Sequence, residues 1–270
     1  MLAADGLVLG HGGRALGAPF DLALRAGEVT CVLGTNGSGK TTLFRTLLGL
    51  IPPVSGRVTL DGHPLHGWSR RGLARRLAYV PQAHLPPFPW RVEEVVMMGR
   101  LAQRGPFSGP AAADRQAVAH ALEAMGLGGF AGADYARLSG GQRQLVLIAR
   151  ALAQEAALIV MDEPAANLDF ANRARLLARI GALAAQSGHG VVIATHEPDH
   201  AFALEARAVA LRRGTLCGDG PARELLSGAF LSRLYGIPVA VELTASGRVA
   251  CTAQAAAATT GNGAGVSRPG

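Results

Sequence analysis

The feature that most constrains the fold of this 270-residue chain is a glycine-rich segment that ends in Lys40-Thr41. Residues 34–41 read Gly-Thr-Asn-Gly-Ser-Gly-Lys-Thr, a match to the pattern G-x-x-x-x-G-K-[ST]. An apolar run typical of a strand, residues 29–33, precedes the segment, and residues 40–50 carry apolar side chains at helical spacing. A glycine-rich turn that matched the pattern by chance would not need a strand before it and a helix after it. The sequence therefore predicts a phosphate-binding loop between a strand and a helix.

Each residue type in this loop has a physical reason for its place. Glycines let the backbone curl so that successive N–H groups point at one anion, and the following helix adds the positive end of its dipole. Lys40 would carry a mobile charge to the outer phosphates of ATP, and the Thr41 hydroxyl would ligate Mg²⁺. The residues predicted to hold the nucleotide are Gly34, Asn36, Gly37, Ser38, Gly39, Lys40, Thr41 and Thr42.

A second element suited to phosphate chemistry is the apolar run 158–161, which ends in Asp162 and Glu163. A buried parallel strand with charge only at its carboxyl end places that charge at the sheet edge where α/β proteins bind ligands. Asp162 would hold Mg²⁺, directly or through water, and Glu163 would act as general base toward an attacking water. Alone, Asp-Glu after a strand is often an ordinary helix N-terminus. Combined with the phosphate loop, it indicates nucleotide hydrolysis.

Strands and helices alternate along most of the chain. Short apolar runs between turn residues predict strands at 7–9, 20–24, 29–33, 56–60, 158–161 and 191–195. Helical spacing covers 40–50, about 92–152 with breaks at Gly126, Gly128 and Gly129, and 172–186. This order predicts an α/β core with a largely parallel sheet, from about residues 1–82 and 155–243, and an inserted helical part over about residues 83–154.

Residues 244–270 differ from the rest of the chain in composition. They are mostly Ala, Gly, Thr and Ser, with almost no large apolar side chain. Such a segment buries too little apolar surface to offset the entropy of ordering its backbone. We therefore predict a low-complexity, disordered tail after residue 243.

Composition elsewhere favours a packed intracellular domain. Apolar residues make up 49% of the sequence, which is ample for a core and argues against disorder. Cys31, Cys217 and Cys251 are odd in number and far apart, which indicates reduced thiols in a cytosolic protein. Residues 1–6 do not resemble a secretory signal. No run approaches the roughly 20 apolar residues that cross a bilayer, so any membrane role is expected to need another protein.

The net charge of +7, from 26 Lys and Arg against 19 Asp and Glu, raises nucleic acid as an alternative partner. The one basic cluster is Arg70, Arg71, Arg75 and Arg76, and no aromatic residue is interleaved with it. A solvated surface helix explains this spacing. No nucleic-acid partner is therefore expected.

Residues 138–142 read Leu-Ser-Gly-Gly-Gln and precede a predicted helix over 142–153. Ser139, Gly140, Gly141 and Gln142 would form a second anion cradle at the amino end of that helix. Together with the phosphate loop, this motif resembles the signature of ATP-binding-cassette (ABC) transporter ATP-binding subunits. The resemblance covers about residues 1–240.

This resemblance implies both a fold and an assembly. The fold is a P-loop NTPase (RecA-like) core with an antiparallel β subdomain and an inserted α-helical subdomain. The assembly is a head-to-tail homodimer, in which each ATP lies between the phosphate loop of one subunit and the signature of the other.

Further family elements follow in order along the chain. Gln82, which ends the run Tyr-Val-Pro-Gln, resembles the glutamine that touches Mg²⁺ and the attacking water and signals to the membrane partner. The run Asn-Leu-Asp that ends at Asp169 resembles the loop that crosses the dimer interface, next to the nucleotide. His196 resembles the switch histidine that contacts the γ-phosphate. The resemblance thus implies that Gln82 and His196 act in catalysis beside Glu163.

Two places depart from the family pattern. His11 stands where relatives often carry a tyrosine that stacks on adenine, so weaker stacking on His11 is expected. Residues 165–167, Ala-Ala-Asn, replace a run of Thr-Ser-Ala type and leave the carboxylates before them intact.

Segments 92–100, 149–154 and 196–201 resemble the importer branch that handles iron–siderophore, cobalamin and haem complexes. That branch joins two ATPase subunits to a dimer of many-helix permeases, with a substrate-binding protein outside. The chain would then be a peripheral subunit at the cytoplasmic face of the inner membrane. Segments 142–148 and 168–172 also resemble molybdate or tungstate importers. Because the ATPase does not touch the cargo, the cargo stays open.

Residues 83–104 contain a proline-stiffened apolar stretch next to Gln82, with Pro86, Pro87, Phe88, Pro89 and Trp90. We expect this stretch to help receive a permease helix; a local core cluster is the alternative. Two other functions also stay open, an exporter subunit and a soluble cassette ATPase in assembly or nucleic-acid processing. The sequence has no fused membrane domain, coiled-coil insertion or long basic arm that would favour them.

Overall fold

The computed structural model describes residues 1–82, 89–105, 108–166 and 168–254. Its central sheet has six strands in the order β12-β11-β5-β10-β9-β8, and every neighbouring pair except β11–β12 is parallel. The strands are β5 (Val29–Leu33), β8 (Leu77–Val80), β9 (Leu158–Asp162), β10 (Gly190–Thr195), β11 (Arg207–Arg212) and β12 (Thr215–Pro221). The predicted α/β core with a largely parallel sheet is confirmed.

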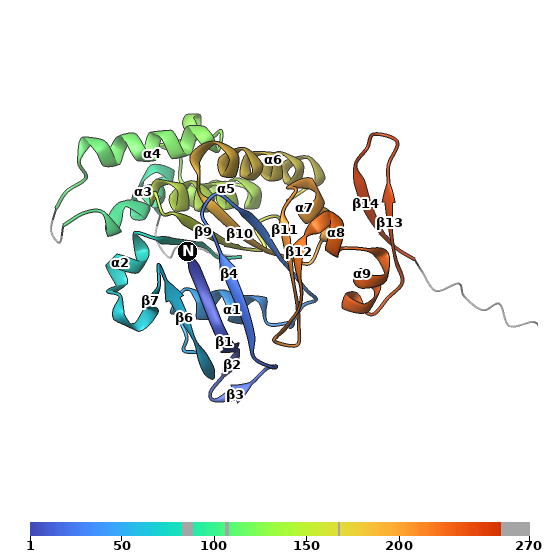
Figure 1. The fold of residues 1–270 in the computed structure, drawn as a ribbon. Coiled ribbons are helices and arrows are strands. Elements are labelled where there is room, and N and C mark those ends of the chain that lie inside the picture. Colours follow the sequence, from blue (N-terminus) through green and yellow to red (C-terminus); the bar gives the residue numbers. More distant parts are fainter. Residues whose placement is uncertain (83–88, 106–107, 167, 255–270) are drawn as a thin grey trace, which may run out of the picture.

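Alternate side chains of the sheet enter two different apolar clusters. In β5, Cys31 and Leu33 belong to a cluster with the helices on one face, whereas Val32 belongs to a cluster on the other face. That second cluster includes Phe44 and Leu47 of α1 (Lys40–Leu47), together with residues of a second sheet. Helix α1 therefore lies between the central sheet and the second sheet (Figure 1).

The second sheet has the antiparallel order β4-β1-β6-β7. Its strands are β1 (Leu2–Val8), β4 (Phe20–Leu24), β6 (Ser55–Leu60) and β7 (His63–Pro64), and a small hairpin of β2 (Gly10–His11) and β3 (Arg14–Ala15) follows β1. Strand β1 begins five residues before the predicted run at Leu7, because Leu2 and Ala4 are also buried. Gly6 has a left-handed φ of 55°, and the register shifts between Ala4 and Leu7, which hides the alternation in the sequence.

Helix α1 ends at Leu47, three residues earlier than predicted. Gly49 has a left-handed φ of 66°, a conformation that often ends a helix. The chain between β7 and β8 holds η1 (Leu65–Gly67) and α2 (Arg70–Ala74). In α2, Arg70 donates to the Gly49 carbonyl oxygen, and Arg71 donates to that of Ala102, as does Arg75, the residue directly after the helix. The predicted surface helix thus uses its arginines to bind neighbouring backbone.

The inserted helical part comprises α3 (Val92–Met97), η2 (Met98–Ala102), α4 (Ala112–Ala124), η3 (Gly128–Phe130), η4 (Tyr135–Arg137) and α5 (Gly140–Ala153). Gly99 permits close packing, because a Cβ there would lie 2.2 Å from the Arg150 carbonyl oxygen in α5. The neighbouring Arg100 is 7% exposed and donates to Asp114 Oδ1 (3.0 Å) and to the Ala153 carbonyl oxygen (2.7 Å). These contacts join η2, α4 and the end of α5.

The remaining helices are α6 (Phe170–Ser187), α7 (Pro198–Ala203), α8 (Ala222–Leu225) and α9 (Gly228–Tyr235). Beyond them, β13 (Val239–Leu243) pairs with β14 (Val249–Ala253), so the predicted disorder after residue 243 is wrong for this strand. Val249 and Cys251 pack against the helix-side cluster, and the Cys251 N–H donates to Asp199 Oδ1 at 2.8 Å. Contacts with α7 thus supply the burial that the local composition lacks. Residues 255–270 lie outside the described part.

In Figure 1 the β13–β14 hairpin stands beside α7 and α9, at the opposite end of the molecule from α2 and α3. Over the described ranges, none of the helices has the length and apolar character needed to traverse a bilayer.

Candidate active site

The phosphate loop joins β5 to α1, where the sequence predicts it. Gly37 and Gly39 have left-handed φ values of 75° and 107°, which glycine adopts without steric cost. At Gly34 a Cβ would lie 2.4 Å from the Leu211 carbonyl oxygen and 2.5 Å from Ser38 Oγ. Ser38 is 3% exposed, and its buried Oγ has no hydrogen-bond partner among the described residues. A buried hydroxyl in want of a partner, just before a helix, suits an anion such as a phosphate oxygen.

Lys40 is buried in the first turn of α1. Its Nζ donates to the carbonyl oxygens of Gly34 (2.8 Å) and Thr35 (3.2 Å) and lies 3.6 Å from Glu163 Oε1. Burial lowers the pKa of the Lys40 ammonium, and attraction to Glu163 opposes that shift. The loop thus holds one positive charge against its own carbonyls. Of the other predicted residues, Asn36 is exposed and Thr42 is half-buried.

The two predicted carboxylates lie at the end of β9: Asp162 is its last residue and Glu163 follows directly. Thr41 Oγ1 donates to Asp162 Oδ2 at 2.9 Å, and Asp162 is 3% exposed. Burial raises the pKa of the Asp162 carboxyl, while the Thr41 hydrogen bond opposes that shift. A metal ion or other cation beside Asp162 would favour its ionised form.

The oxygen donors here fit Mg²⁺, which typically takes one or two carboxylates together with phosphate oxygens and water. Thr41 and Asp162 are already in contact, and Gln82 reaches the adjacent Glu163. Within the ranges that the structure describes, no group of three or more His, Cys, Asp or Glu gathers into a metal site. Phosphate and water would therefore complete the coordination.

Glu163 is the residue at which the predicted catalytic side chains meet. Its backbone is left-handed, with φ of 48°, and its N–H donates to the Ala194 carbonyl oxygen at 3.0 Å. Gln82 Nε2 donates to Glu163 Oε2 at 3.3 Å, and His196 Nδ1 lies 3.5 Å from Glu163 Oε1. Together with Lys40 Nζ at 3.6 Å, side chains from three other segments surround one carboxylate. A carboxylate oriented in this way can accept a proton from a water molecule.

The predicted second cradle begins α5. Ser139 Oγ accepts the N–H of Gln142 at 3.2 Å, and Gln142 Oε1 accepts the N–H of Ser139 at 3.0 Å. This capping box holds Gly140 and Gly141 in the first turn of an exposed helix end. The side-chain hydrogen bonds of Ser139 and Gln142 close within the motif rather than on the phosphate loop.

Two predicted nucleotide contacts stay predictions. Asp169 caps α6, because its Oδ1 accepts the N–H of Asn172 at 2.8 Å and its Oδ2 accepts the Asn172 side-chain amide at 2.7 Å. His11 is exposed in β2, where it pairs with Arg14 of β3. Asn167, two residues before Asp169, lies outside the described residues.

The family profile described as ABC transporter matches residues 18–166, more than half of the chain. The chain belongs to the ABC transporter ATP-binding family. It is 39% identical over 235 residues to an uncharacterized ABC transporter ATP-binding protein of Haemophilus influenzae, covering 87% of this chain and 89% of that protein. It is 40% identical over 241 residues to the hemin import ATP-binding protein HmuV of Streptomyces coelicolor, covering 89% and 85%.

A molybdate import ATP-binding protein of Haemophilus influenzae, MolC, is 34% identical over 220 residues, with 82% of this chain and 81% of that protein covered. Among solved structures, an inward-facing transporter described as of metal-chelate ABC type matches with a TM-score of 0.82 and 30% identity, covering 94% and 97%. A dimeric ATP-binding cassette bound to ADP and Pi matches with a TM-score of 0.71 and 27% identity, covering 83% and 99%. This ABC subunit thus binds ATP and is an ATPase.

Sequence reasoning assigned no role to Glu197, the residue after His196, or to the two side chains that it contacts. Glu197 Oε2 accepts a hydrogen bond from Arg173 Nη1 at 2.8 Å and lies 3.3 Å from His200 Nε2. Arg173 lies one helical turn after Asp169, and Glu197 directly follows His196. That placement is a weak signal in the sequence, and it becomes informative once β10 and α6 are known to lie close together.

Proposed function

We propose that this ABC ATPase is the engine of an importer for metal complexes of the haem or iron–siderophore type. It would work as a homodimer on a permease dimer at the cytoplasmic face of the inner membrane, fed by an extracytoplasmic substrate-binding protein. The observation that carries this proposal is the convergence of Lys40, Gln82 and His196 on Glu163 in a chain similar to a hemin import subunit.

In the proposed mechanism, the residues of the phosphate loop bind the triphosphate. The amides of residues 34–39, the Ser38 hydroxyl and Lys40 would provide donors for the β- and γ-phosphates. Thr41 and Asp162, with Gln82, would hold Mg²⁺, which supplies charge neutralisation at the phosphates when bound.

Glu163 would take a proton from the attacking water. Gln82 donates to one oxygen of this carboxylate, and His196 lies beside the other, so both side chains fix its orientation. A positioned general base typically contributes a factor of about 10² to 10⁴ in rate. His196 is 45% exposed and could also reach the γ-phosphate, as the family resemblance implies.

The exposed cradle at Ser139 supports a dimer. The capping box aims the positive end of α5 outward, and this helix end is a ready anion site. A second subunit, placed head to tail, would bring its phosphate to this cradle. One of the similar solved structures is a dimeric cassette bound to ADP and Pi, which supports pairing of two subunits.

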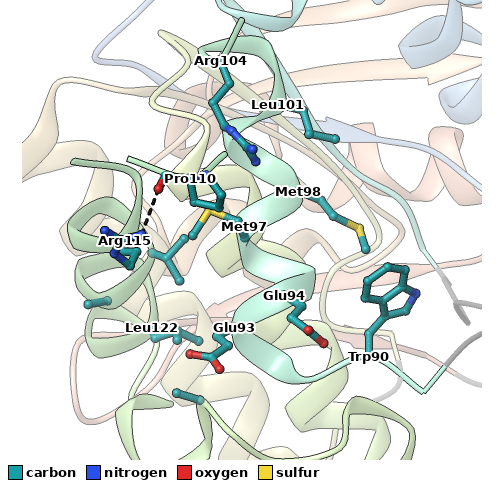
Figure 2. Close-up of a pocket in the computed structure, with 13 residues that line it drawn as sticks. Trp90, Glu93, Glu94, Met97, Met98, Leu101, Arg104, Pro110, Arg115 and Leu122 are labelled. Atoms are coloured by element: carbon teal, nitrogen blue, oxygen red, sulfur yellow. Dashed lines mark hydrogen bonds between the residues drawn. The ribbon is translucent and has the colours of Figure 1, made fainter. Parts of the chain in front are cut away.

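A groove of about 710 Å³ between α3, η2 and α4 offers a seat for a permease helix (Figure 2). Trp90, Met97, Met98 and Leu101 line it, and Leu101 is 62% exposed. Glu93, Glu94, Arg104 and Arg115 surround these apolar side chains with charges of both signs. Phe88, the other aromatic residue that the sequence suggests for docking, lies outside the described residues.

Reconstitution with a permease and a binding protein tests the function. Parental protein should drive ATP-dependent uptake of hemin, whereas Glu163→Gln should keep nucleotide affinity within about twofold and lower hydrolysis by about 100-fold or more. Glu242→Gln, which changes an exposed carboxylate of β13, is the matched control. Hydrolysis at the parental rate by Glu163→Gln would refute the choice of base. Uptake of molybdate without uptake of hemin would refute the cargo and leave the ATPase intact.

A further inference from the structure

Contacts among neighbouring residues hold the segment that carries His196. Thr195, the last residue of β10, pairs with Leu33 of β5, the residue before the phosphate loop. Thr195 and His200 are both buried, at 3% and 5% exposure, and Thr195 Oγ1 lies 2.9 Å from His200 Nδ1. The N–H of Glu197 donates to the same Thr195 Oγ1 at 3.1 Å. His196 therefore sits on a short turn that Thr195 and His200 close.

Glu197 and Thr195 contact opposite ring nitrogens of His200. Nε2 of His200 lies 3.3 Å from Glu197 Oε2 without hydrogen-bond geometry, and Nδ1 lies 2.9 Å from Thr195 Oγ1, which also accepts the Glu197 N–H. The Thr195 hydroxyl can donate its proton to Nδ1, and this contact assigns the proton of a neutral ring to Nε2, on the side of the carboxylate. Burial lowers the pKa of His200, which agrees with a neutral ring.

Arg173 connects this turn to the start of α6, directly after Asp169. Its Nη1 donates to Glu197 Oε2 at 2.8 Å, and both side chains are largely shielded, at 32% and 26% exposure. The backbone N–H of Arg173 donates to the carbonyl oxygen of Asp169 at 2.9 Å, in the first turn of α6. The same carboxylate thus contacts the helix that follows Asp169 and the helix that follows His196.

We infer that Arg173, Glu197 and His200 are positioning residues for ATP hydrolysis. They fix the turn that carries His196 against the start of α6 and so set the place of the His196 imidazole beside Glu163. Any shift of α6 would be transmitted through Arg173 and Glu197 to His196. This inference rests on the roles proposed above for Glu163 and His196.

The first test is Glu197→Gln, which keeps the size of the side chain and removes its charge, together with Arg173→Met. Each should lower kcat for ATP hydrolysis about tenfold and leave KM within about twofold, because catalytic geometry changes while the phosphate loop does not. Arg173→Lys should recover part of kcat, because it keeps the charge. Glu205→Gln is the matched control, since Glu205 meets Arg223 at 3.5 Å on the exposed surface.

A spectroscopic readout separates positioning from general stability. In histidine-labelled protein, the His196 imidazole signal, assigned from its loss in His196→Ala, should shift in Glu197→Gln and Arg173→Met but not in Glu205→Gln. Parental kcat and an unmoved His196 signal in both variants would overturn the inference, provided that His196→Ala impairs hydrolysis. If His196→Ala itself hydrolyses ATP at the parental rate, the role proposed for His196 fails, and the network falls with it.

Discussion

Individual charged residues are buried in this chain in two different ways. Arg100 and Asp114 lie 3.0 Å apart, and each has further hydrogen bonds, to the Ala153 carbonyl oxygen and from the Ala111 N–H. Lys40 and Glu163 are 3.6 Å apart, and no direct hydrogen bond joins them in the described structure. A close, fully hydrogen-bonded pair is costly to separate, whereas a longer pair can exchange partners. The first pair therefore holds the fold, and the second is suited to chemistry.

The Arg100–Asp114 pair should make stability depend on pH. The backbone N–H of Ala111 and the Arg100 guanidinium hold the pKa of Asp114 below its usual value. A depressed folded-state pKa gives stability that is complete above the unfolded pKa, about 4, and is lost as pH falls through the folded value. Asp114→Asn should therefore lower the urea midpoint at pH 7, and its difference from the parent should shrink below about pH 4.

Urea unfolding at pH 7 and pH 3 measures this difference. Asp5→Asn is the control, because Asp5 meets Arg57 on the exposed surface and such pairs contribute little. A difference between Asp114→Asn and the parent that is equally large at both pH values would contradict the assignment.

Residues with a motif were predictable one by one, and residues without a motif were not. Lys40, Thr41, Gln82, Asp162, Glu163 and His196 each follow a sequence pattern, and the structure brings their side chains together. Arg173 and Glu197 are 24 residues apart in sequence. They meet only because α6 and β10 pack side by side. Neither residue has a spacing that differs from an ordinary surface charge, so tertiary contact had to reveal it.

At the scale of elements, α3, η2 and α4 leave a mixed apolar and charged groove on the surface. Arg71 of α2 and Arg75, directly after it, donate to the last carbonyl oxygen of η2, and Arg100 donates to the last carbonyl oxygen of α5. These hydrogen bonds hold η2, which forms part of the groove, against its neighbours. A rigid groove can receive a partner helix without first losing entropy of its own.

Trp90→Ala should weaken binding to the permease about 10- to 30-fold, since buried aromatic anchors dominate interfaces of this kind. ATP hydrolysis by the isolated chain should stay at the parental level, because none of the contacts described above for Lys40 and Glu163 involves Trp90. Copurification with detergent-solubilised permease measures the effect, and Trp68→Ala, which changes the other tryptophan, is the control. Unchanged affinity in Trp90→Ala would exclude this groove as the docking site.

The errors in element prediction have identifiable structural causes. The start of β1 and the strand β14 were missed because each has few large apolar residues, and their burial comes from distant partners, Leu24 for Leu2 and Asp199 for Cys251. The end of α1 was placed too late because the apolar spacing continues past Gly49, whose left-handed backbone ends the helix. Period and composition carry no information about such contacts.

At the scale of the whole molecule, the proposed head-to-tail dimer has a consequence for mixed subunits. Lys40→Ala removes a phosphate ligand, and Ser139→Arg blocks the second cradle. Each variant alone should hydrolyse ATP at least about 100-fold more slowly than the parent. In a mixed dimer, one site combines both defects, and the other combines the intact loop of one chain with the intact cradle of its partner.

An equimolar mixture of the two variants should therefore recover activity, up to about a quarter of the parental rate if pairing is random and the sites act independently. Steady-state ATPase assays of the separate and mixed proteins, with the permease present, measure this recovery. A mixture no more active than its components would argue against sites shared between two subunits.

The alternation of side chains in the central sheet has a further consequence for the melting of the cassette. Each inner strand of the sheet contributes residues to both apolar clusters, so both clusters depend on the same strands. Heat cannot strip the helical layer from the sheet and leave the opposite layer intact, because the same strands would lose half of their packing. The loops at the ends of these strands, which carry the predicted site residues, are therefore expected to unfold together with both apolar clusters.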